Sequence, residues 1–190
     1  MLLLVGLGNP GSNYTNTRHN IGFKIIDAIN LHFKLSKQKP KFKGLLTTGN
    51  IESKKIYAIK PLTFMNNSGT AIKELIDYFK IDAKDVFVFH DDMDIDFGKI
   101  KAKFGGSSAG HNGIDSIDKF IGKDYSRVRV GIGHPKQKKK VNNHVLEDFK
   151  EDEEEKIKEI TDNIVKLVPT LIEKKIDLFS SKVNQNLNGI

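Results

Sequence analysis

The chain opens with an apolar run that passes directly into a polar, glycine-rich loop. Residues 2–5 are Leu-Leu-Leu-Val, and the next six are Gly6-Leu7-Gly8-Asn9-Pro10-Gly11. Such a run predicts a buried strand, and ligands bind open α/β folds where strands end and loops begin. The loop continues through Tyr14 and Thr17-Arg18-His19-Asn20, which add hydroxyls, a guanidinium, an imidazole and an amide. A simple connection needs none of these groups, so we expect a reaction centre here.

Further along the chain, apolar residues alternate between strand spacing and helix spacing. The expected strands cover residues 45–51, 56–59, 86–89 and 128–132, and the first two form a hairpin. The expected helices cover residues 21–33, 71–79, 114–121 and the chain from 151, with Pro169 starting a second helix or kinking the first. Residues 34–43 are expected to be a basic linker. The pattern predicts one domain over residues 1–190, a three-layer α/β sandwich whose mixed, mostly parallel central sheet is flanked by helices, with C-terminal helices from about 150.

Composition limits the environment in which such a chain works. Its 190 residues include no cysteine, which excludes disulfides, thiolate zinc sites and a cysteine nucleophile. No apolar run approaches the length of a membrane span, and Met1 leads straight into the first strand without the basic region of a signal peptide. We therefore expect a cytoplasmic protein with no membrane association.

The net charge of +7 is typical of proteins that bind polyanions, although lysine-rich solvated faces give the same total. Many of the cations stand on three short segments, where alternate positions of a strand share one face. These cations are Lys99, Lys101 and Lys103; Arg127 and Arg129; and Lys136, Lys138, Lys139 and Lys140 in a loop. Aligned cations suit binding along a phosphate backbone, and a solvated strand face is the alternative.

Gly6, Gly8 and Gly11 have the spacing of the dinucleotide-binding fingerprint. In that fingerprint the glycines lead directly into a helix whose N-terminus holds a pyrophosphate. Here helical spacing begins only near Ile21, and the next strand has no acidic residue at its end to bind a ribose. We therefore expect no nucleotide cofactor.

Two titratable side chains stand near the ends of expected strands. A lone histidine is usually structural, but the hydrogen-bonding groups around His19 favour a general base. Asp91 follows His90 after the most apolar strand, where a carboxylate can orient a histidine and stabilise its cationic form. The sequence therefore predicts a general base at His19 and, at Asp91, a carboxylate that orients a histidine.

The sequence motifs do not favour a metal site or a covalent nucleophile. Asp92, Asp94 and Asp96 are spaced like calcium ligands, but Phe97 and Lys103 occupy the positions where that loop requires glycine and glutamate. No histidine spacing matches a zinc site, and no Gly-x-Ser-x-Gly motif provides a nucleophile. Water activated by His19 without a metal is the simplest expectation.

Two polar loops precede expected helices. Asn66-Asn67-Ser68-Gly69 can cap the following helix, with Ser68 as the natural capping residue, or its amides can donate to a carbonyl or phosphate. The small residues of 105–113 can form a flexible connection, or a lid that admits a substrate closely, with Asn112 as a polar anchor.

The segments that carry a family resemblance span most of the chain in order. They are residues 5–11 (VGLGNPG), Tyr14, 17–22 (TRHNxG), 61–69 (PxTFMNxSG), His90-Asp91, 110–113 (GHNG), 129–135 (RVGIGHP) and Val145-Leu146. Together they closely resemble the bacterial-type peptidyl-tRNA hydrolase family. Members of this family hydrolyse the ester between a peptide and the 3′ ribose of tRNA, which recycles tRNA from prematurely released peptidyl-tRNA. Ser107-Ser108-Ala109 departs from the glycine- and histidine-rich loop common there, which bears on lid flexibility.

The resemblance implies roles for individual residues. His19 would be the general base that activates water, and Asp91 would orient it. Asn9, Asn66 and Asn112 would hold the peptide and the terminal nucleotides, with Asn66 or a nearby backbone N–H polarising the ester carbonyl. The other implied contacts are Tyr14, Met65 and His111 in the cleft, Lys101, Lys103 and Arg129 on acceptor-arm phosphates, and Lys138 and Lys140 in support. The implied partner is peptidyl-tRNA, bound through its acceptor arm and 3′ end without a cofactor. We also expect a monomer.

Two other functions fit parts of the sequence. A non-catalytic RNA-binding module would use the basic strands, bind in a salt-sensitive manner and tolerate loss of His19. A nucleotide-dependent oxidoreductase would use the glycine-rich loop and bind NAD. The resemblance favours the hydrolase.

Overall fold

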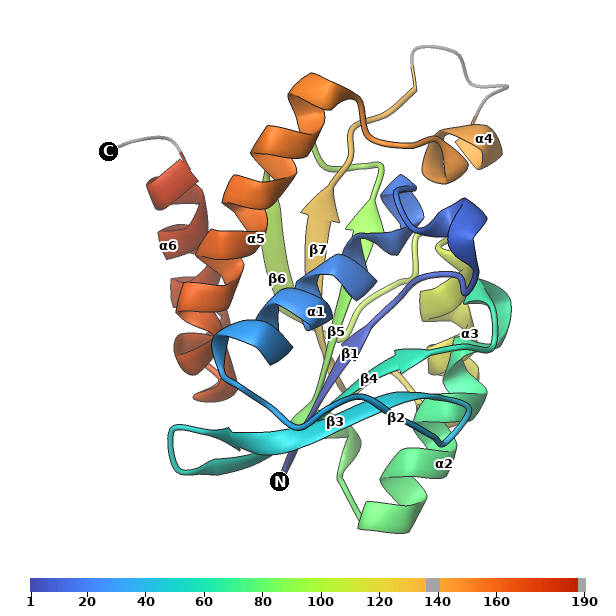
Figure 1. The fold of residues 1–190 in the computed structure, drawn as a ribbon, viewed down its shortest axis with the longest axis vertical. Coiled ribbons are helices and arrows are strands. Elements are labelled where there is room, and N and C mark those ends of the chain that lie inside the picture. The colour runs from blue at the N-terminus through green and yellow to red at the C-terminus, as the bar shows by residue number, and fades with distance from the viewer. Residues whose placement is uncertain (136–140, 188–190) are drawn as a thin grey trace.

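A mixed sheet of seven strands forms the centre of the computed structural model, which describes residues 1–135 and 141–187 (Figure 1). The strand order is β2-β3-β4-β1-β5-β7-β6. Its central strands run parallel to one another: β4 (Lys54–Pro61), β1 (Leu2–Gly6), β5 (Val86–Asp92) and β7 (Ser126–Gly131). The ends of β1 and β5 lie side by side, because the N–H of Leu7 donates to the carbonyl of Phe89 at 3.0 Å.

Antiparallel strands flank this parallel group. β3 (Gly44–Ile51) forms the expected hairpin with β4, and β6 (Ile100–Phe104) pairs with β7. The short strand β2 (Lys39–Lys41) pairs with β3, within residues that the sequence predicted to be only a linker. All three residues of β2 are exposed, so the strand has no apolar residue that could have predicted it.

Helices cover both faces of the sheet (Figure 1). One face carries α1 (Ile21–His32), α5 (Glu151–Ile172) and α6 (Ile176–Leu187), and the other carries α2 (Ser68–Phe79) and α3 (Asn112–Ile121). Successive strand residues point to opposite faces, so Leu4 belongs to the first core and Leu3 to the second. The arrangement confirms the predicted three-layer α/β sandwich.

Short helical segments lie in the connections. They are η1 (Ser12–Tyr14), η2 (Arg18–Asn20), η3 (Met65–Asn67), η4 (Ala83–Asp85) and α4 (Val141–Leu146). Because η1 and η2 separate β1 from α1, the glycine-rich loop does not lead directly into a helix. None of the helices in residues 1–135 and 141–187 has the length and apolar character needed to cross a membrane.

Of the two alternatives expected for Pro169, a kink or the start of a second helix, the second was wrong. Helix α5 continues through Pro169, and α6 begins only at Ile176. Proline lacks the N–H that would bond one turn back, which weakens a helix at that point. Val168 and Leu171 are fully buried beside it, and their packing keeps this turn helical.

Two glycines bring helix α1 against the end of the sheet. A Cβ atom on Gly6 would lie 2.2 Å from the carbonyl oxygen of Gly22, and one on Gly22 would lie 2.4 Å from that of Phe89. Neither position can therefore carry a side chain at this separation. The close approach places η2, and with it His19, above the ends of β1 and β5.

Helix α6 covers the outer edge of strand β6. The side chain of Asn184 accepts from the N–H of Ile100 at 2.9 Å and donates to the carbonyl of the same residue at 2.7 Å. Two residues along the strand, the N–H of Ala102 donates to the hydroxyl of Ser180 at 2.8 Å. Helix side chains thus take the place of an eighth strand.

We expect Asn184→Ala to lower the free energy of unfolding by about 1–3 kcal/mol, because it leaves the partly buried N–H and carbonyl of Ile100 without partners. Urea denaturation measures this change. Ser181→Ala, at an exposed position of the same helix, is the control and should change stability by less than about 0.5 kcal/mol. Equal stability of the two variants would contradict the proposed edge contact.

Candidate active site

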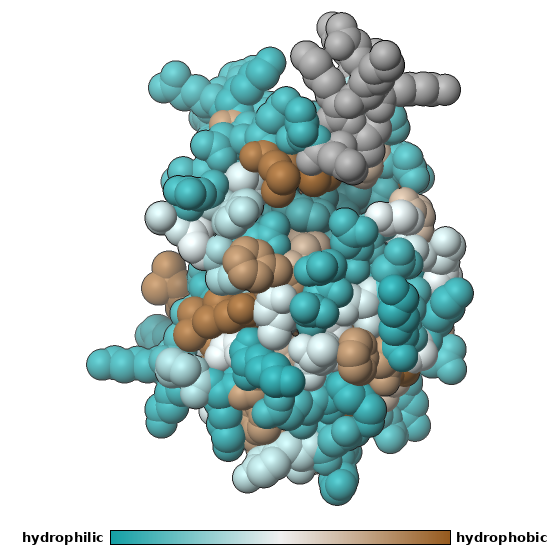
Figure 2. All heavy atoms as spheres, turned by 90° about the vertical axis from the view of Figure 1, so that its right-hand side faces the viewer, coloured by the Kyte–Doolittle hydropathy of each residue, from teal (hydrophilic) through white to brown (hydrophobic). Residues whose placement is uncertain are grey.

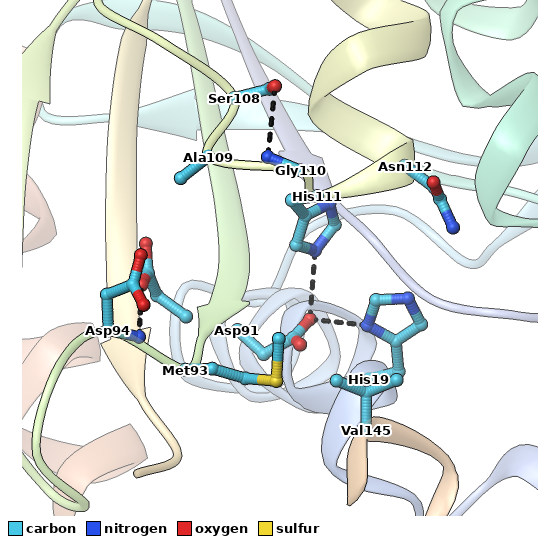
Figure 3. Close-up of a pocket in the computed structure, with 11 residues that line it drawn as sticks. His19, Asp91, Met93, Asp94, Ser108, Ala109, Gly110, His111, Asn112 and Val145 are labelled. Atoms are coloured by element: carbon cyan, nitrogen blue, oxygen red, sulfur yellow. Dashed lines mark hydrogen bonds and ion pairs between the residues drawn. The ribbon is translucent and has the colours of Figure 1, made fainter. Parts of the chain in front are cut away.

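Asp91 is the centre of the site (Figure 3). Its Oδ1 atom lies 2.8 Å from Nδ1 of His19 and 3.0 Å from Nε2 of His111. The carboxylate is 1% exposed, at the end of β5, whereas the two histidines come from η2 and from the start of α3. Three segments distant in the sequence therefore meet at one carboxylate oxygen.

Hydrogen bonds fix which nitrogen of each ring carries a proton. Nδ1 of His111 accepts from the N–H groups of Gly113 and Ile114, at 3.1 and 3.3 Å, and so caps helix α3. Its proton is therefore on Nε2, which donates to Asp91. His19 likewise donates from Nδ1, which leaves Nε2 of the neutral ring as an acceptor. That atom points away from Asp91, on the side of Asn112 (Figure 3).

Burial and pairing act in opposite directions on these groups. Burial raises the pKa of Asp91, but the charges and hydrogen bonds of His19 and His111 outweigh burial and hold it well below its usual range. Burial lowers the pKa of His19, but the charge of Asp91 and its hydrogen bond produce a net rise. Asp91 is thus a carboxylate that makes His19 a stronger base.

A cavity of about 100 Å³ lies beside this cluster. Four of the expected site residues, His19, Asp91, His111 and Asn112, line it together with Val145 of α4. Residues 92–94 and 108–110 complete the wall. The volume has room for water molecules beside His19.

Asn20, the residue after His19, holds the backbone of Asn9. Its Oδ1 accepts from the N–H of Asn9 at 2.8 Å, and its Nδ2 donates to the carbonyl of Asn9 at 2.9 Å. Oδ1 of Asn9 accepts from the N–H of Met65 at 2.8 Å. Within the described residues, the Nδ2 group of Asn9 therefore remains an unused donor.

Asn66 and Tyr14 lie outside the cavity wall. Asn66 is exposed on η3, and Tyr14 is half-buried on η1. The Tyr14 ring meets the exposed ring of Phe64 edge-on, with 6.4 Å between centroids. Tyr14 and Asn66, two residues expected to contact the substrate, are therefore near η3 rather than beside Asp91.

The expectation that Ser68 caps helix α2 was wrong. Ser68 is the first residue of the helix, and its hydroxyl donates to the carbonyl of Met65 at 2.9 Å. The N–H of Gly69 instead donates to the hydroxyl of Ser116 in α3, at 3.0 Å. A distant partner thus supplies the cap, which a local sequence pattern could not predict.

Lys101 and Lys103 face Arg129 and Arg127 across strands β6 and β7. Burial and the charges of the two arginines lower the pKa of Lys103, a sign of concentrated positive charge. Lys101 is exposed, and Arg129 is partly exposed while its Nε donates to Asp92 at 2.7 Å. The three cations expected to bind phosphate therefore lie together near the cavity.

Arg127 departs from the expected row of free cations. Its side chain is 1% exposed and donates to Asp118 at 2.8 Å and to the carbonyl of Ser107 at 2.8 Å. It therefore anchors the loop of residues 105–113 rather than facing a partner. Lys138 and Lys140 lie outside the described residues.

Sequence reasoning assigned no role to two buried residues of the site, Asn20 and His90. Both stood in matched motifs, next to His19 and Asp91, and this adjacency was the signal that could have found them. His90 is 3% exposed. Burial and the neighbouring His111 hold the pKa of His90 well below its usual value.

Donor atoms of His19, Asp91 and His111 lie within 4.8 Å of one another, close enough to surround a metal ion. A metal binds the lone pair of a histidine nitrogen, so that nitrogen must lose its proton. The backbone N–H groups on Nδ1 of His111 keep the proton on Nε2, the atom that faces the cluster. The donor set therefore fits a hydrogen-bonded cluster better than a metal site.

Comparison with known proteins reveals a family. The peptidyl-tRNA hydrolase family model matches residues 3–189. A curated peptidyl-tRNA hydrolase from Pelagibacter ubique is 72% identical over 184 residues, covering 97% of this chain and 99% of that protein. One from Ehrlichia ruminantium is 46% identical over 181 residues, covering 95% and 93%. The crystal structure of peptidyl-tRNA hydrolase from Acinetobacter baumannii has a TM-score of 0.91 at 34% identity, covering 97% of this chain and 94% of that one.

A buried histidine–aspartate pair at the strand ends of an α/β sandwich is typical of a hydrolytic enzyme. Within that class, the chain belongs to the peptidyl-tRNA hydrolase family. It is therefore an enzyme that hydrolyses an ester bond in peptidyl-tRNA, as the sequence resemblance implied. The assignment sets aside the non-catalytic RNA-binding module and the nucleotide-dependent oxidoreductase.

We expect two histidines of the site to titrate on opposite sides of the usual value. The pKa of His19 should lie above 6.5 and that of His90 well below it. Asp91→Asn should lower the pKa of His19, because burial then acts without the opposing negative charge. Long-range ¹H–¹⁵N NMR spectra recorded over a pH series measure these values. A His19 pKa unchanged by Asp91→Asn would contradict the coupling.

Proposed function

We propose that the enzyme hydrolyses peptidyl-tRNA without a metal, using a water molecule activated by His19. The bond from His19 to Asp91, 2.8 Å long, is the observation that carries the proposal. It leaves Nε2 of His19 free to take a proton from water as that water attacks the ester carbonyl. Asp91 holds the ring in this tautomer and stabilises the imidazolium that forms, as the acid of a catalytic triad does.

We assign the asparagines to the substrate. The unused Nδ2 donor of Asn9, the exposed amide of Asn66 and Asn112 at the cavity wall lie on segments around His19. Neutral amides of this kind hold a peptide backbone and terminal nucleotides by hydrogen bonds. Asn66 or a nearby backbone N–H would stabilise the negative charge that develops on the ester carbonyl oxygen. Tyr14, Met65 and His111 would line the cleft around them.

We assign the cations of β6 and β7 to the acceptor arm of the tRNA. Lys101, Lys103 and Arg129 share one face of these strands, which suits a row of phosphates. The side of the molecule on which α2, α3 and α4 lie is mostly hydrophilic, with apolar groups scattered over it rather than gathered into one patch (Figure 2). Such a surface suits a hydrated, charged partner.

The tautomer of His111 supports the absence of a metal from this mechanism, because a proton occupies the nitrogen that a metal would need. We further propose that the chain acts in the cytoplasm as a single-domain monomer that recycles tRNA from prematurely released peptidyl-tRNA. Light scattering of the purified enzyme at micromolar concentration tests the monomer.

His19→Ala should lower kcat on N-acetyl-aminoacyl-tRNA by about 10²–10⁴-fold, the usual contribution of a general base. The dissociation constant for this substrate should stay within about threefold of the parent value, because the phosphate and amide contacts remain. Single-turnover hydrolysis measures the rate, and fluorescence titration measures binding.

His32→Ala is the matched control, since His32 is an exposed histidine on helix α1. It should leave both quantities unchanged. If His19→Ala weakens binding as much as it slows hydrolysis, His19 holds the substrate and is not the base.

Lys101→Gln and Arg129→Gln should mainly raise KM and make it depend less steeply on salt. Removing one phosphate-binding cation lowers the slope of log KM against log salt by about 0.7–0.9. Steady-state assays from low to moderate KCl concentration measure the slope. Lys55→Gln, at an exposed position on β4, is the control. An unaltered slope in Arg129→Gln would show that Arg129 does not contact phosphate.

A further inference from the structure

We propose that His90 is a positioning residue for the hydrolysis: through Asp91, it holds the carboxylate that His19 and His111 share. His90 directly precedes Asp91 on β5 and is 3% exposed. It does not line the cavity. Its effect on the reaction would therefore pass through its neighbours, and the inference rests on the proposed role of the His19–Asp91 pair.

The first observation is a hydrogen bond to the backbone of Asp91. Nδ1 of His90 lies 2.7 Å from the carbonyl oxygen of Asp91. A carbonyl oxygen only accepts, so Nδ1 carries the proton. This bond fixes the orientation of the peptide group that follows Asp91. The carboxylate is attached to the same residue, so a rotation of that peptide would move Oδ1 relative to both histidines.

The second observation is the packing of the rings. The centroid of His90 lies 4.8 Å from that of His111, with the rings nearly perpendicular at 72°. The centroid of His111 lies 4.9 Å from that of His19. His90 thus supports the side of His111 and, through His111, the arrangement in which two rings donate to one oxygen.

The third observation concerns charge. The titratable groups that act on His90 are Asp91 on its own strand, His111 at the start of α3, and Arg129, its register neighbour on β7. Burial and the two basic neighbours outweigh Asp91 and keep the imidazole neutral. Because the His90 ring is neutral, it does not compete with His19 for the negative charge of Asp91. A cation at this position would compete for that charge and weaken the base.

The fourth observation is that stability alone does not explain a histidine here. Nε2 of His90 is buried and has no hydrogen-bond partner within residues 1–135 and 141–187. A buried polar atom without a partner is unfavourable, and an apolar ring of similar size would avoid it. The Nδ1 bond to Asp91 is what the histidine provides and a phenylalanine would lack.

Two substitutions separate the hydrogen bond from the ring. His90→Phe keeps a ring in the core but removes the donor, and His90→Asn keeps a donor near the position of Nδ1. We expect His90→Phe to lower kcat by about 10–100-fold with KM changed less than about twofold, since small displacements of a catalytic group have effects of this size. His90→Asn should recover most of that loss.

The pH profile of kcat adds a readout that a purely structural role would not move. In His90→Phe the contact between Asp91 and His19 loosens, so the pKa of His19 falls and the acidic limb shifts to lower pH. In His90→Asn the limb should stay at the parent position. If His90→Phe does not fold, His90→Gln replaces it, because its amide reaches the Nε2 position and leaves Nδ1 without a substitute.

The proposal is overturned if the variant without the donor keeps the parent kcat, or if His90→Asn loses as much activity as that variant. It is also overturned if only thermal stability changes and the pH profile of the folded enzyme does not. Failure of the general-base mechanism gives a different result, because His19→Ala would then either remain active or lose substrate binding as much as hydrolysis, whatever the His90 variants do. The two outcomes are therefore distinguishable.

Discussion

A buried carboxylate must be paired, and the rest of the site is built around this requirement. Asp91 is 1% exposed at the end of a central strand, and one of its oxygens receives both His19 and His111. Removing either histidine would leave part of a buried negative charge without compensation. His19 lies in η2, just before α1, and His111 caps α3. The charge therefore holds two distant segments against the sheet.

Several constraints serve this one arrangement. Gly6 and Gly22 allow α1 to approach the sheet, which brings His19 within reach of Asp91. The amide groups at the start of α3 determine the tautomer of His111, so that its proton faces the carboxylate. Asn20 ties Asn9 to the same turn as His19. Asp91 thus determines the proton position on His19, and backbone amides determine that on His111.

Sequence patterns predicted what depends on local spacing. The buried strand at residues 86–89, the helix from Ile21 and the meeting of strand ends near His19 and Asp91 follow from periodicity and from the rules of parallel sheets. Partners that are distant in the sequence were not predictable. Arg127 was grouped with free cations but is buried against Asp118, and Ser116 rather than Ser68 caps α2. Strand β2 carries no apolar residue, and packing around Pro169 keeps α5 continuous.

The side-chain amide that Asn184 presents to β6 also affects how copies of this chain meet. An exposed strand edge is a template on which another chain can pair, and this is a common route to fibrils. On one side, Asn184 already bonds to the N–H and the carbonyl of Ile100, and Ser180 to the N–H of Ala102. On the other, β2 ends the sheet with Lys39-Pro40-Lys41, whose charges and missing amide hydrogen disfavour pairing. Both borders of the sheet therefore resist growth by strand addition.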